Sequence, residues 1–188
     1  MTGNERLLFF LRYLRSPRNM GSITPSSRYL VAALVRLSNI ASARIVVELG
    51  PGTGPFTAGL LAEMRPDARL LCVERDPALA DHLRARFRDP RLTVLTGDAQ
   101  DLERFLADEG IAGRVPLIVS GLPFSSLPAE VRHGILATVT HCLAPDGLFL
   151  LYQYSPAMRS LLRRYFHRVE SRWELRNFPP ALVMRCTL

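Results

Sequence analysis

The fold is indicated most clearly by the residues Val47-Glu48-Leu49-Gly50-Pro51-Gly52-Thr53-Gly54. An apolar run leads into three glycines at alternate positions, and Pro55 follows them at a place suited to the first turn of a helix. Glycine lets the backbone turn sharply and come close to a ligand. A strand, a glycine-rich turn and a helix in this order are typical of α/β proteins that bind a ligand at the carboxyl ends of parallel strands.

The rest of the chain continues the alternation of strand and helix. Short runs rich in Val, Leu and Ile predict strands buried on both faces at Arg44–Leu49, Arg69–Glu74, Leu92–Gly97, Val115–Ser120 and Leu148–Tyr154. Helices are predicted between them at Pro55–Met64, Pro77–Arg88, Asp101–Asp108 and Pro128–Cys142. Two further strands, His167–Leu175 and Ala181–Thr187, flank a turn at Asn177–Pro180 and predict an antiparallel hairpin. The sequence therefore predicts an α/β fold: a mostly parallel sheet of seven strands with helices on both faces.

The first part of the chain reads differently. Asn4–Arg15 predicts a short amphipathic helix, and a second helix is expected to start near Thr24, with Pro25 in its first turn, and to run through Leu37. Four apolar residues fall on one side of the first helix, and arginines fall on the other: Leu7, Phe10, Leu11 and Leu14 against Arg12 and Arg15. We therefore expect an N-terminal helix with its connector over residues 1–22 and one domain over residues 23–188.

Composition limits the partners and the compartment. The formal net charge is +7, and all 24 basic residues are arginines, whose planar guanidinium groups suit planar anions and above all phosphate. This excess predicts a polyanionic partner, either nucleic acid or an anionic membrane surface. No apolar run is long enough to span a membrane, and Leu7–Leu11 is too short for a secretory signal, so we expect a cytoplasmic protein. The three cysteines are expected to be buried reduced thiols, and the scattered histidines predict no metal site.

Three strand ends carry candidate ligand-binding residues. A dinucleotide-binding loop would place its third glycine at position 55, which is Pro55, and a phosphate-binding P-loop would need a lysine that this sequence lacks. Glu74 ends the second strand, where a carboxylate accepts hydrogen bonds from the hydroxyls of a ribose, although the same position serves NAD. Asp98 and Ala99 follow the third strand. The alternative is a simple turn with solvated acids, but three such elements at successive strand ends make that reading weak.

The loop resembles the first motif of class I methyltransferases, E-x-G-x-G-x-G, and the resemblance implies S-adenosylmethionine as cofactor and S-adenosylhomocysteine as product. It implies that Glu48 contacts the ammonium group of the methionine end, that Glu74 binds the ribose, and that Asp98 accepts the adenine amino group beside the N–H of Ala99. The complete set of expected cofactor-binding residues is Glu48, Gly50, Gly52, Thr53, Gly54, Glu74, Arg75, Asp98, Ala99, Gly121 and Leu122.

The fourth strand ends in Ser120-Gly121-Leu122-Pro123-Phe124, at the place of the N-L-P-Y or N-P-P-Y loop of amino-methylating enzymes. In that motif the Asn and a backbone carbonyl accept hydrogen bonds from the target amine, and the aromatic residue packs on it. Here Gly121 stands in the place of the Asn, so a planar base amine would lose one acceptor. An aliphatic amine depends less on it, and an aromatic face, expected from Phe124, stabilises the cationic product. The alternative is that Phe124 is a core residue.

As a whole, the chain resembles the bacterial phospholipid N-methyltransferases, relatives of the ribosomal RNA adenine dimethyltransferases. Besides the motifs above, the resemblance rests on the arginine-rich amphipathic start and on the tail Arg176–Ala181. It implies transfer of methyl groups to the amine of phosphatidylethanolamine, and of its partly methylated forms, towards phosphatidylcholine. It also implies peripheral association with the cytoplasmic membrane, with the N-terminal helix on an anionic surface. The alternative for this helix is a lid over the domain.

Three more residues are expected to bind substrate: Tyr13 and Tyr154 would contact the ammonium group, and Arg18 would hold the lipid phosphate. Purely structural roles for them stay open. The alternative function is an rRNA adenine N6-methyltransferase, which charge favours, whereas Gly121 and the absence of the helical C-terminal domain usual in RNA enzymes lead us to expect no nucleic acid. A non-enzymatic cofactor-binding scaffold is a third possibility, disfavoured by the complete set of acids and glycines.

Overall fold

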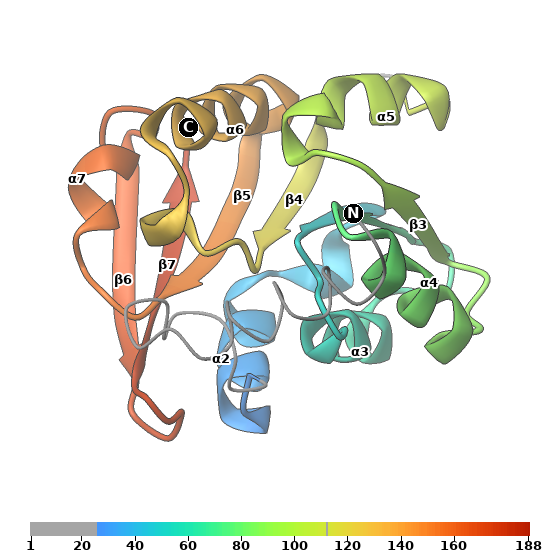
Figure 1. Cartoon of the computed structure of the whole chain (residues 1–188), viewed down its shortest axis with the longest axis horizontal. Coiled ribbons are helices and arrows are strands. Elements are labelled where there is room, and N and C mark those ends of the chain that lie inside the picture. Colours follow the sequence, from blue (N-terminus) through green and yellow to red (C-terminus); the bar gives the residue numbers. More distant parts are fainter. Residues whose placement is uncertain (1–25, 112) are drawn as a thin grey trace, which may run out of the picture.

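Strands and helices alternate along the chain as the sequence predicts (Figure 1). The computed structural model describes residues 26–111 and 113–188. The strands are β1 (Ile45–Leu49), β2 (Arg69–Glu74), β3 (Leu92–Thr96), β4 (Val115–Ser120), β5 (Leu143–Gln153), β6 (Arg168–Glu174) and β7 (Ala181–Thr187). The α-helices are α2 (Arg28–Leu37), α3 (Pro55–Glu63), α4 (Pro77–Arg86), α5 (Leu102–Asp108), α6 (Ala129–Cys142) and α7 (Met158–Leu162), and short 3-10 turns are η2 (Ile40–Ser42), η3 (Ala99–Asp101) and η4 (Phe124–Ser126).

All the described strands form one seven-stranded sheet in the order β3-β2-β1-β4-β5-β7-β6. β1 lies between β2 and β4 and is parallel to both, with Val47 paired to Leu71 on one side and to Ile118 on the other. β7 runs antiparallel to β5 and β6, which gives the expected hairpin. The strand order reverses between β1 and β4, and ligands of such sheets bind outside the carboxyl ends of the strands at that point.

The helices bury the two faces of the sheet in two separate cores. Alternate residues of one strand point to opposite faces, so Val47 packs with α5 and α6 whereas Val46 packs with α2 and α3. Figure 1 shows α5, α6 and α7 on one face and α2, α3 and α4 on the other. This double cover confirms the α/β architecture expected from the sequence.

Several boundaries differ from those expected. β3 lies at the edge of the sheet and is half-buried, so the expectation that it is buried on both faces is wrong. β5 begins at Leu143, because Leu143 pairs with Val115 before an irregularity in the register. α2 begins at Arg28, capped by the Ser27 hydroxyl, rather than near Thr24. The helix expected at Asn4–Arg15 lies outside the described residues.

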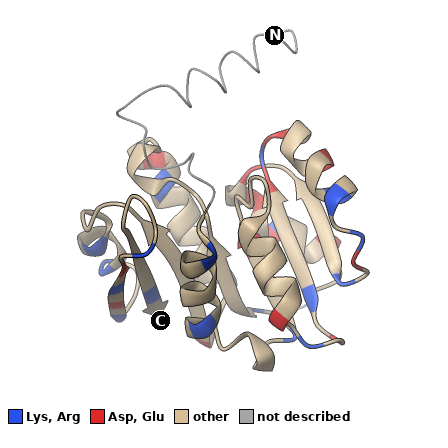
Figure 2. Ribbon diagram, turned by 90° about the horizontal axis from the view of Figure 1, so that it is seen from below, with Lys and Arg blue, Asp and Glu red and all other residues tan. Residues whose placement is uncertain are grey.

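The described residues contain no helix that is long and apolar enough to cross a membrane. Nor do they bring together three or more side chains suited to hold a metal ion. Cys72, Cys142 and Cys186 are buried free thiols, as expected, and burial raises the pKa of Cys142 to about 11 and that of Cys186 to about 12. Figure 2 shows basic and acidic positions on both halves of the ribbon, so the arginines of the described residues are not confined to one helix.

Candidate functional site

The glycine loop makes a left-handed path from β1 to α3. Gly50, Gly52 and Gly54 have φ angles of 68°, 59° and 82°, a region that glycine adopts without strain. A Cβ added to Gly52 would meet nothing within 4 Å, so the space beside this backbone is open. α3 starts directly after Gly54 and has no side-chain cap at its N-terminus. The loop thus presents open space and the positive end of a helix dipole at the carboxyl end of β1.

Glu74 joins this loop to the end of β2. Its Oε2 accepts a hydrogen bond from the Gly52 N–H at 3.0 Å, and its Oε1 accepts one from the Asp76 N–H at 3.0 Å. The side chain is buried, with 7% of its surface exposed. Each carboxylate oxygen keeps a further lone pair, so Glu74 can still accept hydrogen bonds from a bound ligand.

Glu48 is buried at the end of β1. It lies on the face of β1 that α3 covers, where its Oε2 accepts hydrogen bonds from the Thr57 hydroxyl at 2.7 Å and from the Cys72 thiol at 3.3 Å. Burial raises the pKa of Glu48 to about 7, although the Thr57 and Cys72 hydrogen bonds oppose this shift. Glu48, expected to contact the methionine end of the cofactor, therefore also ties β1 to Thr57 of α3.

Asp98 and Ala99 lie beyond the end of β3, where the chain turns into η3. The Asp98 carboxylate accepts a hydrogen bond from the Gln100 N–H at 2.9 Å and faces the exposed Arg75 guanidinium at 3.9 Å. Ala99 is buried against the core. Asp98 therefore retains a partly exposed carboxylate at the third of the successive strand ends. Arg75, also expected to bind the cofactor, therefore lies beside this carboxylate.

The β4 loop touches the β1 loop directly. A Cβ on Gly121 would lie 2.6 Å from the Gly50 carbonyl oxygen, and a Cβ on Gly50 would lie 2.6 Å from the Leu122 side chain. A side chain at Gly121 would require a backbone shift, whereas a side chain at Gly50 would have to displace the Leu122 side chain. Gly121, the residue that stands in place of the motif's Asn, is therefore fitted to the close approach of the two loops.

Gln153 fixes the backbone carbonyl of Leu122, the residue after Gly121. The Gln153 side-chain amide donates to the Leu122 carbonyl at 3.0 Å, and the Phe124 N–H donates to the same oxygen at 2.9 Å. Gln153 is buried at the end of β5. The sequence reasoning missed this residue, although a polar side chain ending an apolar strand was a usable signal.

Phe124 does not supply the aromatic face expected of it. Its side chain is fully buried and packs edge-on against Phe149, with ring centroids 6.4 Å apart. The turn η4 directs it into the core between the sheet and α6. Phe124 is thus a core residue, which was the alternative interpretation of the sequence. In the described residues, the exposed side of this loop is formed by Gly121, Leu122 and Pro123, each half-buried.

Aromatic side chains instead gather at the end of β5. Tyr152 and Tyr154 lie on the same side of the strand with ring centroids 6.0 Å apart, and Tyr152 lies 5.2 Å from Phe56 at the start of α3. Burial raises the pKa of both tyrosines, so their hydroxyls stay neutral donors. The sequence reasoning named Tyr154 and missed Tyr152. Tyr13 and Arg18 lie outside the described residues.

Arg86 is a further residue that sequence reasoning missed. It extends from the end of α4, and its guanidinium donates a hydrogen bond to the Thr53 carbonyl at 2.7 Å. This contact fixes the backbone of the glycine loop between Gly52 and Gly54. Thr53 itself is exposed. Nothing in the sequence marked Arg86, because a lone arginine at the end of a helix is usually a solvated residue.

The arrangement fits an adenosyl ligand. The open space beside Gly52 accommodates a ligand close to backbone, and carboxylates stand at the ends of the next two strands. Carboxylates at these places can accept hydrogen bonds from ribose hydroxyls and from an amino group. The Gly50–Gly121 contact brings a second loop, with its carbonyl and aromatic neighbours, to the same edge.

Comparison with known proteins agrees with this geometry. Residues 46–147 match the family model described as a methyltransferase domain. The chain is 37% identical over 181 residues to an ornithine lipid N-methyltransferase of Singulisphaera acidiphila, and the match covers 95% of this chain and 94% of that protein. It is 36% identical over 133 residues to the ribosomal RNA small subunit methyltransferase A of Phenylobacterium zucineum, a match that covers 67% of this chain and 41% of that protein.

Solved structures share the fold. The N-methyltransferase NodS from Bradyrhizobium japonicum superposes with a TM-score of 0.67 at 16% identity, covering 85% of this chain and 94% of that one. Human methyltransferase-like protein 13, solved in complex with SAH, superposes with a TM-score of 0.59 at 20% identity, covering 84% of this chain and 78% of that one. At these identities the likeness concerns the fold.

Proposed function

The chain belongs to the methyltransferase family, in the class I group that uses S-adenosylmethionine, and from this premise we propose that it methylates the aliphatic amine of a membrane lipid. S-adenosylmethionine is the methyl donor and S-adenosylhomocysteine is the product. The observation that carries the proposal is the 37% identity to a lipid N-methyltransferase across 95% of this chain and 94% of that relative. The ribosomal RNA relative, by contrast, is matched over 41% of its length.

The acceptor loop supports an aliphatic amine. A planar base would be held by a side-chain amide and an aromatic face, but Gly121 has no side chain and the Phe124 ring is buried in the core. The Leu122 carbonyl already accepts hydrogen bonds from the Gln153 amide and the Phe124 N–H, so an amine proton would have to take the place of one of these donors. Tyr154 supplies a neutral aromatic ring at the next strand end, where it can stabilise a methylated ammonium.

Bound S-adenosylmethionine supplies an electrophilic methyl group and a thioether leaving group, so the work left to the chain is positioning. Glu74 would accept hydrogen bonds from the ribose hydroxyls while the Gly52 N–H keeps its carboxylate in place. Asp98 would accept a hydrogen bond from the adenine amino group, and the backbone at Gly52 would leave room for the methionine end. The amine reaches the site after losing its proton to water.

The headgroup is the finer part of the proposal. Phosphatidylethanolamine carries a primary amine next to a phosphate, which suits a chain whose cations are all arginine. The relative in Singulisphaera acidiphila is named for an ornithine lipid, which also carries an amine. We propose phosphatidylethanolamine and its mono- and dimethyl forms as substrates, and an ornithine lipid is the competing acceptor that the assay must include.

Association with the membrane follows from such a substrate. We propose that the protein binds the cytoplasmic membrane peripherally and that residues 1–22 form an amphipathic attachment to the domain of residues 23–188. The support is the sequence, where an apolar stripe opposes Arg12 and Arg15. Arg18 and Tyr13 would then meet the lipid phosphate and amine. Deleting residues 1–15 should lower binding to anionic vesicles while cofactor affinity is kept.

The decisive experiment is methyl transfer from labelled S-adenosylmethionine to mixed vesicles. Purified protein is incubated with phosphatidylethanolamine, with an ornithine lipid and with ribosomal RNA in parallel, and labelled products are separated by thin-layer chromatography or gel. We expect label in phosphatidylethanolamine and its methylated forms. The variant Gly52→Ala serves as the matched control, because it should lose the label if the activity belongs to this protein.

Other outcomes revise the proposal at different levels. Label confined to the ornithine lipid would overturn the headgroup and keep lipid N-methylation. Label in RNA adenine and in neither lipid would replace the proposal by the ribosomal RNA function.

A further inference from the structure

The large apolar side chains that the described residues expose lie at one end of the β6–β7 hairpin. Trp173, Leu175 and Phe178 have 46%, 73% and 85% of their surface exposed. Trp173 is near the end of β6, and Leu175 and Phe178 are in the turn that leads to β7. Scattered single apolar residues are normal on a protein surface, but three within six positions form a patch that needs a partner.

Arginines lie next to this patch, on the side of the hairpin that faces α2. A hollow of about 410 Å³ lies between α2 and the hairpin, and its charged lining consists of Arg36, Arg172 and Arg176 with the single acid Glu174. Arg176 donates to both oxygens of Glu174 and also stacks over Tyr29, 4.7 Å from the ring centroid. Glu174 is thus already neutralised by one arginine, and the border keeps a net positive charge.

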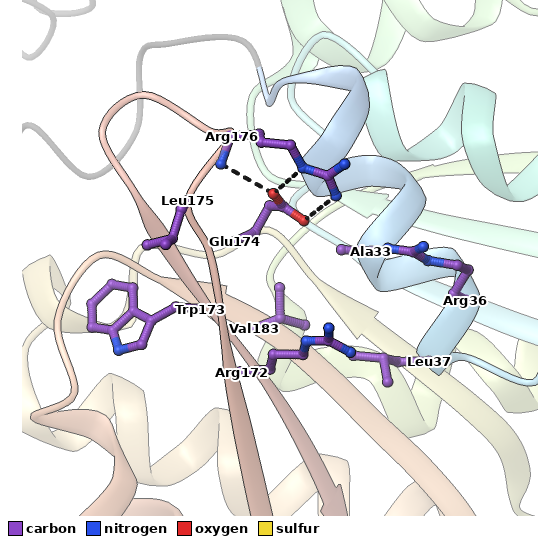
Figure 3. A pocket seen from close by; sticks show the side chains of 9 residues that line it. All are labelled: Ala33, Arg36, Leu37, Arg172, Trp173, Glu174, Leu175, Arg176 and Val183. Atoms are coloured by element: carbon purple, nitrogen blue, oxygen red, sulfur yellow. Dashed lines mark hydrogen bonds and ion pairs between the residues drawn. The ribbon is translucent and has the colours of Figure 1, made fainter.

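The two kinds of side chain point in opposite directions. Figure 3 shows Trp173 and Leu175 on the side of β6 away from α2, whereas Arg172, Glu174 and Arg176 point toward α2. Alternation along a strand produces this division. The end of the hairpin therefore has an apolar side and a basic side, which is the arrangement of an interfacial membrane contact.

The hairpin end also lies at the edge of the sheet that carries the site. β6 is parallel to β5, because both run antiparallel to β7, so Glu174 and the turn after it lie at the same edge as Gln153. Asn177 holds this turn in place: its Oδ1 accepts the Ser27 N–H at 3.0 Å and its Nδ2 donates to the Pro179 carbonyl at 2.7 Å. The patch is thus fixed relative to the acceptor loop.

We propose that the end of the β6–β7 hairpin is a membrane-docking surface for anionic bilayers, in addition to any contact made by the N-terminal residues. We call it the hairpin surface and define it as Trp173, Leu175 and Phe178 with Arg28, Arg172 and Arg176. Arg28 belongs to it because its guanidinium stacks on the same Tyr29 ring as that of Arg176, 4.9 Å from the ring centroid. Its apolar side chains enter the headgroup region while its arginines face lipid phosphates. The proposal rests on the proposed lipid substrate, because docking through the hairpin surface would turn the acceptor loop toward the bilayer that contains this substrate.

Charge complementarity favours a bilayer over a second copy of the chain. A symmetric contact between two hairpin surfaces would bring the arginines of both copies together, and like charges in contact oppose association. An anionic bilayer satisfies the apolar and the basic side at once. The same surface would therefore respond to the lipid charge and to salt, because exposed charge attraction is screened over about 8–10 Å at physiological ionic strength.

The test is co-sedimentation of the full chain with phosphatidylcholine vesicles that do or do not contain phosphatidylglycerol, without cofactor. Leu175→Ser with Phe178→Ser removes two largely exposed apolar side chains, and Arg28→Glu with Arg172→Glu reverses two exposed arginines. We expect each double variant to lower the partition coefficient on anionic vesicles by about tenfold or more, from the usual contributions of buried methylenes and of basic residues near an anionic surface. The arginine variant should have little effect on pure phosphatidylcholine.

The matched control is Arg44→Glu with Arg114→Glu, which makes the same change of net charge. Arg44 and Arg114 are exposed and precede β1 and β4, at the opposite edge of the sheet. This control should bind anionic vesicles several-fold better than the hairpin arginine variant. Circular dichroism and thermal unfolding establish that each variant is folded.

The outcomes separate this proposal from the proposed function. Hairpin variants that bind like the wild type, or a control that binds as poorly as they do, overturn the hairpin surface even if lipid methylation is found. A wild type that elutes as a dimer, with a monomeric Leu175→Ser and Phe178→Ser variant, also overturns it in favour of self-association. Reduced binding by the hairpin variants supports the docking surface even if the methylation assay selects another acceptor lipid.

Discussion

The Glu74 carboxylate and the Gly52 N–H are joined by a hydrogen bond of 3.0 Å that links the ends of two neighbouring strands. Glu74 is nearly buried, whereas Gly52 borders open space. The contact means that the residue expected to bind ribose also sets the position of the loop beside it. Substitutions in either partner should therefore report on the cofactor site.

Replacing the acids at the strand ends should weaken cofactor binding. Glu74→Ala and Asp98→Ala each remove a charged acceptor, so we expect each to cost about 1–3 kcal/mol of S-adenosylmethionine binding free energy by calorimetry. Glu63→Ala, which removes an exposed carboxylate at the end of α3, is the control and should bind normally. Unchanged affinity in both site variants would refute the placement of the adenosine.

Gly52→Ala should separate backbone strain from loss of ligand space. Gly52 and Gly110 have similar φ angles of 59° and 67°, and a Cβ on either meets nothing within 4 Å. Alanine should therefore cost both positions a similar free energy of unfolding, on the order of 1–2 kcal/mol. Only Gly52→Ala should lose S-adenosylmethionine binding in calorimetry, because Gly110 lies in the turn after α5. Equal affinity of the two variants would contradict this use of the open space.

Gly121→Asn should impair the site although it restores the residue of the amino-methylating motif. Its Cβ would approach the Gly50 carbonyl oxygen to 2.6 Å, so the β1 and β4 loops must separate. We expect a loss of about 1–3 kcal/mol in the free energy of unfolding, as for other overpacked sites, together with weaker cofactor binding. Chemical denaturation and calorimetry measure the two effects. A variant that is as stable as the wild type and gains activity on RNA would show that the loops adapt.

The buried Glu48 should make stability depend on pH. Burial raises its pKa from 4.5 to about 7, so the folded state holds the proton more tightly than the unfolded state. The resulting contribution is fully present below about pH 4.5 and is lost as the pH rises through about 7. Glu48→Gln keeps an acceptor for Thr57 but does not ionise. It should match the wild type near pH 4.5 and be more stable by on the order of 3 kcal/mol at pH 8 in denaturant unfolding. A constant difference between the two proteins across this range would rule the shift out.

Asn177→Ala should loosen the hairpin from α2. It removes the acceptor for the Ser27 N–H and the donor to the Pro179 carbonyl, both at a buried side chain. We expect a cost of about 1–3 kcal/mol in the free energy of unfolding. Asn177→Asp keeps the acceptor but sets a buried carboxylate oxygen against the Pro179 carbonyl, so it should be no more stable than the alanine variant in urea titrations at neutral pH. An alanine variant of wild-type stability would mean that other contacts hold the turn.

The order of the strands and helices, and the position of the glycine loop between β1 and α3, could be predicted from local sequence patterns. Apolar runs of strand length, helices between them, and three alternating glycines are local patterns, and they led directly to β1, α3 and the parallel sheet. The acids Glu74 and Asp98 were found for the same reason, because a residue that follows a predicted strand must lie at the carboxyl edge of the sheet.

The direction and the burial of the neighbouring side chains, in contrast, depend on tertiary packing. Glu48 and Glu74 both belong to parallel strands, yet Glu48 faces Thr57 of α3 whereas Glu74 faces the loop. The Phe124 ring packs on Phe149 in the core. Gln153, 31 residues after Leu122, donates a hydrogen bond to the Leu122 carbonyl. These choices depend on contacts between residues far apart in the chain. The repeat of apolar residues along one strand or helix does not predict such contacts, because they form only when the sheet and its two helical layers pack together.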